Sequence, residues 1–176
     1  MRAMSRHPLM RSAMVACACA LVAGASAFTT TGPRGPAIDA PVADAAQRGD
    51  ATTVKQLLDK RADVNVAQGD GMTALHWAAL HGDLAMTNLL LAAKANVKAV
   101  TRIGAYTPLH IASKDGNAAV VHALLKAGAD PNTPTASGAT ALHFAAASGS
   151  VGAVNELLDQ HADPLHPLFQ GSPTFF

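Results

Sequence analysis

A four-residue motif recurs along the chain at a nearly constant interval, and this repeat constrains the fold more than any other feature. The motif is Thr-Ala-Leu-His at residues 73–76, Thr-Pro-Leu-His at 107–110 and Thr-Ala-Leu-His at 140–143. A period of 33 to 34 residues is typical of a solenoid, in which one structural unit stacks on copies of itself. The landmarks that keep the same register are a glycine (Gly49, Gly82, Gly116, Gly149), a leucine pair (Leu57-Leu58, Leu90-Leu91, Leu124-Leu125, Leu157-Leu158) and an alanine (Ala62, Ala95, Ala129, Ala162).

The residues around each motif predict two helices per unit. The threonine that opens the motif is a favoured N-cap, because its hydroxyl accepts a hydrogen bond from a first-turn N–H, and Pro108 suits the first helical position. The glycine of each unit is suited to the left-handed conformation that ends the first helix. The next residue is again a favoured N-cap in every unit (Asp50, Asp83, Asn117, Ser150). Second helices are therefore predicted over 51–60, 84–93, 118–127 and 151–160.

The composition favours a core of packed helices. Hydrophobic residues make up 49% of the chain but aromatic residues only 4%, and much of the apolar content is alanine. Small apolar side chains suit close helix-on-helix stacking better than a β-sandwich. We expect the leucine pairs of the second helices to share an apolar face, which one unit cannot bury without its neighbours.

These motifs together resemble the ankyrin repeat, whose signature includes T-P-L-H-x-A. The resemblance implies an all-α solenoid of about four helix–turn–helix units with hairpin-like fingers between them. It covers residues 38–165, divided at about 38–70, 71–104, 105–137 and 138–165. It further implies a non-catalytic module that binds another protein through its concave face.

Several positions depart from the family pattern. The glycine that usually ends the second helix is present as Gly128, whereas three units carry Arg61, Lys94 and His161 there. These three side chains would adopt a left-handed conformation at some cost, and their charge would complement the helix C-terminus. The usual asparagine is present at residues 65 and 132 and absent at residues 98 and 165, where lysine and leucine stand. An extra residue near 104–106 should widen that finger.

The N-terminus predicts a cleaved export signal over residues 1–27. Arg2, Arg6 and Arg11 precede an uncharged apolar stretch at 12–24, and Ala-Ser-Ala at 25–27 is a cleavage site. The mature protein would start near Phe28 with a flexible lead-in at 28–37, and it would be periplasmic or extracellular. Phe28 and the hydroxyl-rich stretch after it also resemble the leader of plastid proteins in algae with secondary plastids, which is the alternative. A retained membrane anchor is a further alternative, although the apolar stretch is too short to span a bilayer.

Signal removal would change the charge and the cysteine count. The loss of three of the 13 Lys and Arg leaves ten against 12 Asp and Glu, a formal charge of −2, and it removes Cys17 and Cys19. No basic stripe for a phosphate backbone remains, so we expect no nucleic-acid partner. We expect no membrane association after cleavage either.

No motif for catalysis, a metal or a cofactor stands out. The resemblance implies a structural role for His76, His110 and His143, which would bond to their own motif threonine and bridge neighbouring units. Gly69 to Ala74 matches a dinucleotide-loop pattern, but the stretch is the finger before the second motif. No G-x-S-x-G elbow or acid–base carboxylate pair is found, so we predict no enzyme activity and no cofactor.

The resemblance assigns the binding face to finger tips and first-helix surfaces. The candidate partner-binding residues at those offsets are Asp70, Met72, Leu80, His81, Arg102, Ile103, Tyr106, Lys114, Asp115, Ser137, Ala147 and Ser148. Tyr106 and Arg102 are the expected anchors, since tyrosine and arginine are enriched at binding hot spots. Trp77 lies at an offset that core residues usually fill.

The C-terminal segment 166–176 has an irregular sequence that ends in Phe175 and Phe176. Two interpretations stand: the segment covers the fourth unit as a cap, or the array is truncated there. We expect a monomer. The alternative function is an architectural fragment that associates with itself through an uncapped C-terminal end.

Overall fold

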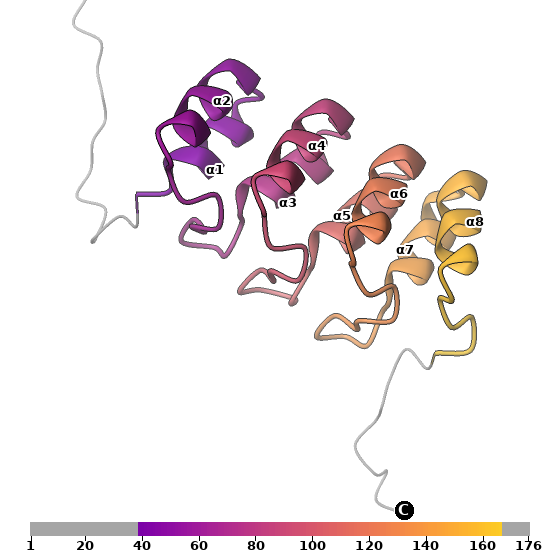
Figure 1. Ribbon diagram of the computed structural model, residues 1–176. Coiled ribbons are helices and arrows are strands. Elements are labelled where there is room, and N and C mark those ends of the chain that lie inside the picture. The colour runs from indigo at the N-terminus through magenta and orange to yellow at the C-terminus, as the bar shows by residue number, and fades with distance from the viewer. Residues whose placement is uncertain (1–38, 167–176) are drawn as a thin grey trace, which may run out of the picture. The chain divides into compact units, whose positions relative to one another are not determined.

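The computed structural model describes residues 39–166, and within this range it contains eight helices and no strand. The helices form four antiparallel pairs that follow one another in a row (Figure 1). Their bounds are α1 Pro41–Gln47, α2 Ala51–Asp59, α3 Ala74–Leu80, α4 Leu84–Ala92, α5 Pro108–Lys114, α6 Ala118–Lys126, α7 Ala141–Ser148 and α8 Val151–Asp159. The predicted signal (1–27), lead-in (28–37) and all but His166 of the C-terminal segment lie outside the described residues.

The second helices begin where the sequence predicts and end one residue earlier. Asp50, Asp83 and Ser150 each accept a hydrogen bond from a first-turn backbone N–H, at 2.9, 2.9 and 3.3 Å. Asn117 is the N-cap of α6, as the sequence predicts, but its side chain makes no such bond. Its side chain lies instead against Gly82 of the preceding pair, where a Cβ would come within 2.7 Å of the Asn117 amide nitrogen. The Asn117 side chain therefore contributes to the contact between pairs rather than to a capping bond.

The left-handed residues follow the repeat. The glycine after each first helix has φ between 63° and 71°. Arg61, Lys94 and His161 have φ of 61°, 66° and 63°, as their position in the repeat predicts, and Gly128 has φ of 90°. A side chain in this conformation costs about 1–2 kcal/mol, so the fold accepts local strain at three of its four second-helix ends.

The core consists of alanines and leucines on the first helices and of larger apolar residues on the second helices. Ala74, Ala78 and Ala79 on α3 are fully buried, and the position of Ala78 is a buried alanine on every first helix (Ala45, Ala112, Ala145). The leucine pairs differ in burial, because Leu57 and Leu58 on α2 are both half-buried whereas Leu124 and Leu125 on α6 are both buried. The first member is buried in α4, α6 and α8, whereas Leu158, a second member, is 42% exposed. Trp77 is half-buried and donates from Nε1 to the Gln68 side chain at 2.9 Å, so it packs on the core without being enclosed by it.

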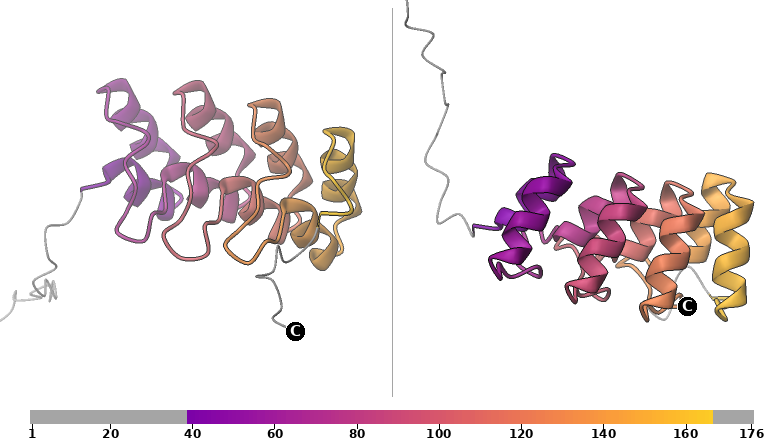
Figure 2. Two further views of the ribbon diagram at one scale, coloured as in Figure 1. Left: turned by 90° about the horizontal axis from the view of Figure 1, so that it is seen from below. Right: turned by 45° about the horizontal axis from the view of Figure 1, so that its top comes forward.

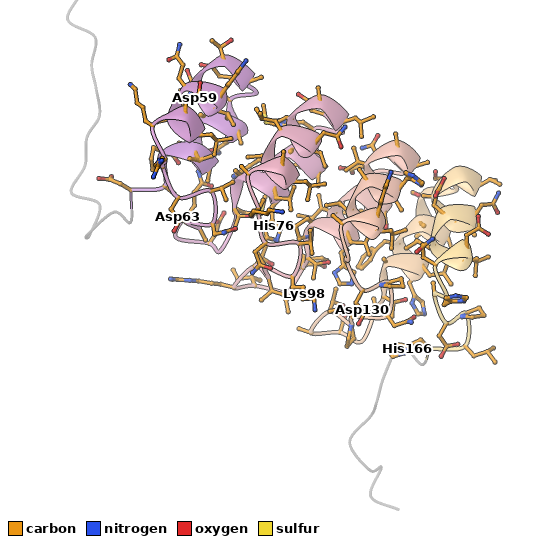
Figure 3. The ribbon with its side chains drawn as sticks, in the orientation of Figure 1. Asp59, Asp63, His76, Lys98, Asp130 and His166 are labelled. Atoms are coloured by element: carbon orange, nitrogen blue, oxygen red, sulfur yellow. The ribbon has the colours of Figure 1, made fainter. Side chains whose placement is uncertain are left out.

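Two motif histidines, His76 and His110, bridge neighbouring pairs. His76 is labelled in Figure 3. The backbone N–H of Thr73 donates to Nδ1 of His76 at 3.1 Å, so the ring proton is placed on Nε2, which reaches the Tyr106 carbonyl at 3.0 Å. His110 repeats this arrangement between Thr107 and the Thr133 carbonyl. Burial lowers the pKa of both imidazoles. The structural role that the resemblance implies is thus confirmed for these two residues, whose ring nitrogens are both occupied.

Asparagines clamp two of the three junctions between pairs. Asn65 accepts from the Asn96 N–H at 2.7 Å and donates to the Lys94 carbonyl at 3.4 Å. Asn132 contacts the Asp163 N–H and the His161 carbonyl in the same way, at 2.7 and 3.1 Å. Lys98 stands at the corresponding position between the second and third pairs, so this junction lacks the clamp.

Leu124 provides the test of the stack. It is completely buried on α6, so Leu124→Ala should lower the free energy of unfolding by about 2–5 kcal/mol. Leu84, which is 39% exposed on α4, is the matched control, and its replacement by alanine should cost clearly less. Urea denaturation followed by circular dichroism measures both. Equal losses for the two variants would contradict the packing described above.

The bridging histidines predict a pH dependence of stability. Because burial holds the pKa of His76 and His110 below the ordinary value of about 6.5, the unfolded chain binds more protons than the folded one in that range. Their contribution is complete above about pH 6.5 and is lost as the pH falls through their folded pKa values. The free energy of unfolding should therefore decrease between about pH 7 and pH 5, and less steeply in His110→Gln. The exposed His81→Gln is the control, and an identical slope in both variants would refute the assignment.

Candidate functional site

Three hairpin-like fingers precede α3, α5 and α7, and we name each after the helix that follows it. A backbone hydrogen bond closes each finger, from Gln68 to Met72, from Thr101 to Tyr106 and from Thr135 to Ala139, at 2.8 to 3.0 Å. Neighbouring fingers are also joined, because the Arg102 N–H donates to the Asp70 carbonyl and the Ala136 N–H to the Gly104 carbonyl, both at 2.9 Å. The fingers therefore form a continuous row along one edge of the helix pairs (Figure 2). We call the surface of these fingers and the adjoining first helices the inner face.

The α5 finger is wider than the other two, as the extra residue predicts. Its closing bond spans five residue positions, whereas the closing bonds of the α3 and α7 fingers span four. The Thr101 hydroxyl fills the additional width, since it accepts from the Tyr106 N–H at 3.0 Å and donates to the Ile103 carbonyl at 2.8 Å. Gly104 and Ala105 are both left-handed, with φ of 80° and 52°. This turn presents Ile103 at the tip with 84% of its surface exposed.

The Tyr106 side chain braces the same finger. Its ring lies so close beneath Gly104 that any side chain at residue 104 would collide with it. The ring also packs against Phe144 on α7, with centroids 5.7 Å apart, and edge-on against His110. Tyr106 is half-buried in this position, so it supports the finger as well as offering a surface.

A shallow groove of about 320 Å³ lies on the inner face between the second and third helix pairs. Its lining residues are Asp70, Met72, Leu80, Thr101, Ile103, Tyr106, Ile111, Lys114 and Asp115. Seven of these are among the twelve residues that the sequence nominates. The structure thus gathers residues from two fingers and two helices into a single depression that is mostly apolar, with charges at its rim.

The other five nominated residues lie outside the groove. Arg102 and His81 are exposed beside it, on the α5 finger and at the end of α3. Ser137 is exposed on the α7 finger and bonds to the Thr135 hydroxyl at 3.1 Å, and Ala147 is exposed on α7. The Ser148 hydroxyl donates to the Ser113 carbonyl at 3.2 Å and therefore joins α7 to α5.

Thr101 and Ile111 line the groove but are absent from the nominated set. Ile111 lies four residues after its motif threonine, at the position that Trp77 and Phe144 hold in the neighbouring units. All three side chains are half-buried, which the sequence does not distinguish from full burial. The sequence signal that could have identified Ile111 is the bulky residue found four positions after each motif threonine.

The charges at the groove are available to a partner. Asp70, Lys114 and Asp115 are exposed, and the only side-chain ion pair in the described part of the chain is His122–Glu156, which lies on α6 and α8. One oxygen of Asp70 accepts from the Met72 N–H at 2.9 Å, which orients this carboxylate.

A second opening lies at the same junction, where Lys98 replaces the clamping asparagine. This cavity of about 250 Å³ is lined by Val97, Lys98, Thr107, Ala129, Asp130 and Thr133. Figure 3 shows Lys98 and Asp130 at the bases of successive loops. The junction between the second and third pairs is therefore open on both sides.

No cluster of three metal-binding side chains occurs within residues 39–166. In the same range, no helix has the length and hydropathy that crossing a bilayer requires. The chemistry that the inner face offers is apolar contact, hydrogen bonding and charge pairing.

The family model described as "Ankyrin repeats (3 copies)" matches the chain over residues 9–101, 42–135 and 97–167. Among curated proteins, the chain is similar to palmitoyltransferase AKR1 of Lachancea kluyveri, with 39% identity over 82 residues. It is also similar to the tyrosine-protein kinase Shark of Drosophila melanogaster, with 37% identity over 94 residues. A third relative is the human ankyrin repeat and SOCS box protein 3, with 35% identity over 94 residues.

These similarities cover a part of each protein. The matched stretches span 47%, 53% and 52% of this chain but only 11%, 10% and 18% of the three relatives, in the same order.

Proposed function

This chain belongs to the ankyrin-repeat family, and we propose that it is a non-catalytic interaction module that binds a partner protein through its inner face. Ankyrin repeats in general mediate binding between proteins, and the fold alone does not name the partner. The observation that supports the site is the groove between the second and third helix pairs, where seven nominated residues meet.

The groove has the composition of a binding hot spot. Met72, Leu80 and Ile103 offer apolar surface beside the tyrosine ring of residue 106, and exposed charges surround it. Buried apolar anchors with a polar rim are the usual anatomy of a specific interface. A partner that inserts an apolar side chain between the α5 finger and α3 would contact all three residues.

Rigidity supports the same proposal. The α5 finger is bonded to the α3 finger on one side and to the α7 finger on the other, and its turn is closed by Thr101. A partner that meets a finger already held in place has less ordering entropy to overcome. The finger tip can therefore contribute most of its contact energy to affinity.

The enzyme names among the relatives do not extend to this chain. The similarity to palmitoyltransferase AKR1 covers 82 residues, or 11% of that protein. The similarities to the kinase and to the SOCS-box protein likewise cover only 10% and 18% of those proteins. A shared binding scaffold accounts for all three similarities without a shared reaction.

A pair of substitutions tests the groove. Leu80→Asp and Ile103→Asp place charge on two exposed groove residues without touching the buried core, so binding of the co-purified partner should weaken at least about tenfold. Val151→Asp is the matched control, because Val151 is 71% exposed but lies on α8 away from the groove. Partners are identified by mass spectrometry and their affinities measured by interferometry. Wild-type affinity in both groove variants would refute the site.

Arg102→Ala tests the predicted anchor Arg102 independently of the residues that line the groove. Arg102 contributes its backbone to the finger and exposes its side chain, so this variant should keep its fold. Tyr106→Ala is a poorer test, because it also removes the ring that packs on Phe144.

We infer export from the sequence of residues 1–27, which combines a basic start, an uncharged apolar stretch and an A-x-A site. The module would then act in the periplasm or outside the cell, or in the plastid of an alga with a secondary plastid. N-terminal sequencing of the protein from its native source should find a mature end near Phe28, or further along if a plastid peptidase follows. An intact Met1 or Arg2 end would rule out the signal.

A further inference from the structure

The asparagine clamps use both ends of a single carboxamide group. At the first junction, between the first and second helix pairs, Asn65 Oδ1 accepts from the Asn96 N–H and Asn65 Nδ2 donates to the Lys94 carbonyl. At the third junction, between the third and fourth pairs, Asn132 makes the same two contacts with the unit that follows it. The following unit therefore presents one backbone N–H and one carbonyl that together fit a primary carboxamide.

The second junction has the corresponding backbone groups but a different side chain. The Asp130 N–H corresponds to that of Asn96, and the Gly128 carbonyl corresponds to that of Lys94, each 34 residues later. Lys98 stands where the other two junctions have asparagine. Since an ammonium group has three donors and no acceptor, Lys98 cannot accept from the Asp130 N–H as an asparagine does.

A cavity of about 250 Å³ lies at this position. Lys98 lines it from one unit and Ala129 and Asp130 from the next, so it lies between the same two loops that the carboxamides join at the other junctions. Lys98 and Asp130 are labelled in Figure 3. No lining residue carries a carboxamide, and Val97 and Ala129 provide apolar surface. Pockets that hold small ligands begin at about 300 Å³, so a single side chain from outside can enter this one.

We propose that this cavity binds the side-chain carboxamide of an asparagine or glutamine residue from a partner protein. The oxygen of that carboxamide accepts from the Asp130 N–H, and its nitrogen donates to the Gly128 carbonyl, as the chain's own asparagines do at the first and third junctions. The cavity shares no lining residue with the groove on the inner face. It is therefore a second binding site, and it does not depend on the function proposed for the groove.

Other polar groups complement this backbone pair less well. A carboxylate can accept from the Asp130 N–H, but it has no donor for the Gly128 carbonyl, and the Asp130 carboxylate that lines the cavity repels it. A trans peptide group carries its N–H and its oxygen on opposite sides. A primary carboxamide carries an N–H and the oxygen on the same side, as both clamps require.

Titration of the full chain with a neutral one-residue probe tests the site. N-acetyl-asparagine methylamide should shift the backbone amide signals of Ala129 and Asp130 in a nitrogen–proton correlation spectrum. N-acetyl-leucine methylamide is the matched control probe, because leucine has nearly the shape of asparagine without its donor and acceptor. The leucine probe should bind at least about tenfold more weakly, since it leaves both backbone groups without a hydrogen bond.

Two substitutions of Lys98 test the same site from within the chain. Lys98→Asn supplies the carboxamide internally, so this variant should lose the response to the asparagine probe. It should also melt a few degrees higher than the wild type, because it gains the clamp. Lys98→Ala is the matched control, since it leaves the cavity open, and it should keep the response.

Three results would overturn the carboxamide site. The first is that millimolar asparagine probe leaves the signals of Ala129 and Asp130 unmoved. The second is equal affinity for the asparagine and leucine probes. The third is tighter binding of N-acetyl-aspartate methylamide, which would make the cavity an anion site. None of these results bears on the groove, whose own test uses Leu80 and Ile103, so the two sites can fail separately.

Discussion

The structure depends on burial that no helix pair achieves alone. Alanines along the first helices allow neighbouring pairs to approach closely, and buried leucines from α4, α6 and α8 fill the space behind them. The polar contacts follow from this proximity, because only neighbours held this close place a histidine ring within reach of the next unit's carbonyl. Disturbing the apolar stack would therefore remove the histidine bridges as well. Removing a histidine bridge, by contrast, need not disturb the apolar stack.

Local turn chemistry explains why much of this fold is predictable from the sequence. A cap or a left-handed residue depends on its nearest neighbours, so the helix starts and the unusual conformations of Arg61, Lys94 and His161 agree with the repeat. Side-chain contacts are harder to predict where a neighbouring unit intervenes. Asn117 is a good N-cap by type, yet its side chain lies over Gly82 of the pair before it. The half-burial of Trp77 likewise depends on Gln68 from the adjoining finger.

The groove was predictable only in part, and two departures from the repeat meet at the junction where it lies. The extra residue lengthens the α5 finger and raises Ile103 above its neighbours. Lys98 removes the clamp on the opposite side of the same junction, where the second cavity lies. Each departure is visible in the sequence. The sequence does not show that both departures lie at the junction between the second and third pairs, because this depends on how the loops pack side by side. Ile111 was missed for the same reason, since only the packing places it in the groove.

The strained turn of the α5 finger connects this architecture to binding. Ala105 holds a left-handed backbone that costs about 1–2 kcal/mol, and such strain persists only where the surroundings fix it. Here the Thr101 hydroxyl, the Tyr106 ring and the two adjoining fingers fix it. A shorter finger would avoid this cost, but it would also lack the additional reach that exposes Ile103. The strain is therefore inseparable from the feature that makes the groove suited to a partner, and a partner must be shaped to this one finger rather than to the repeat in general.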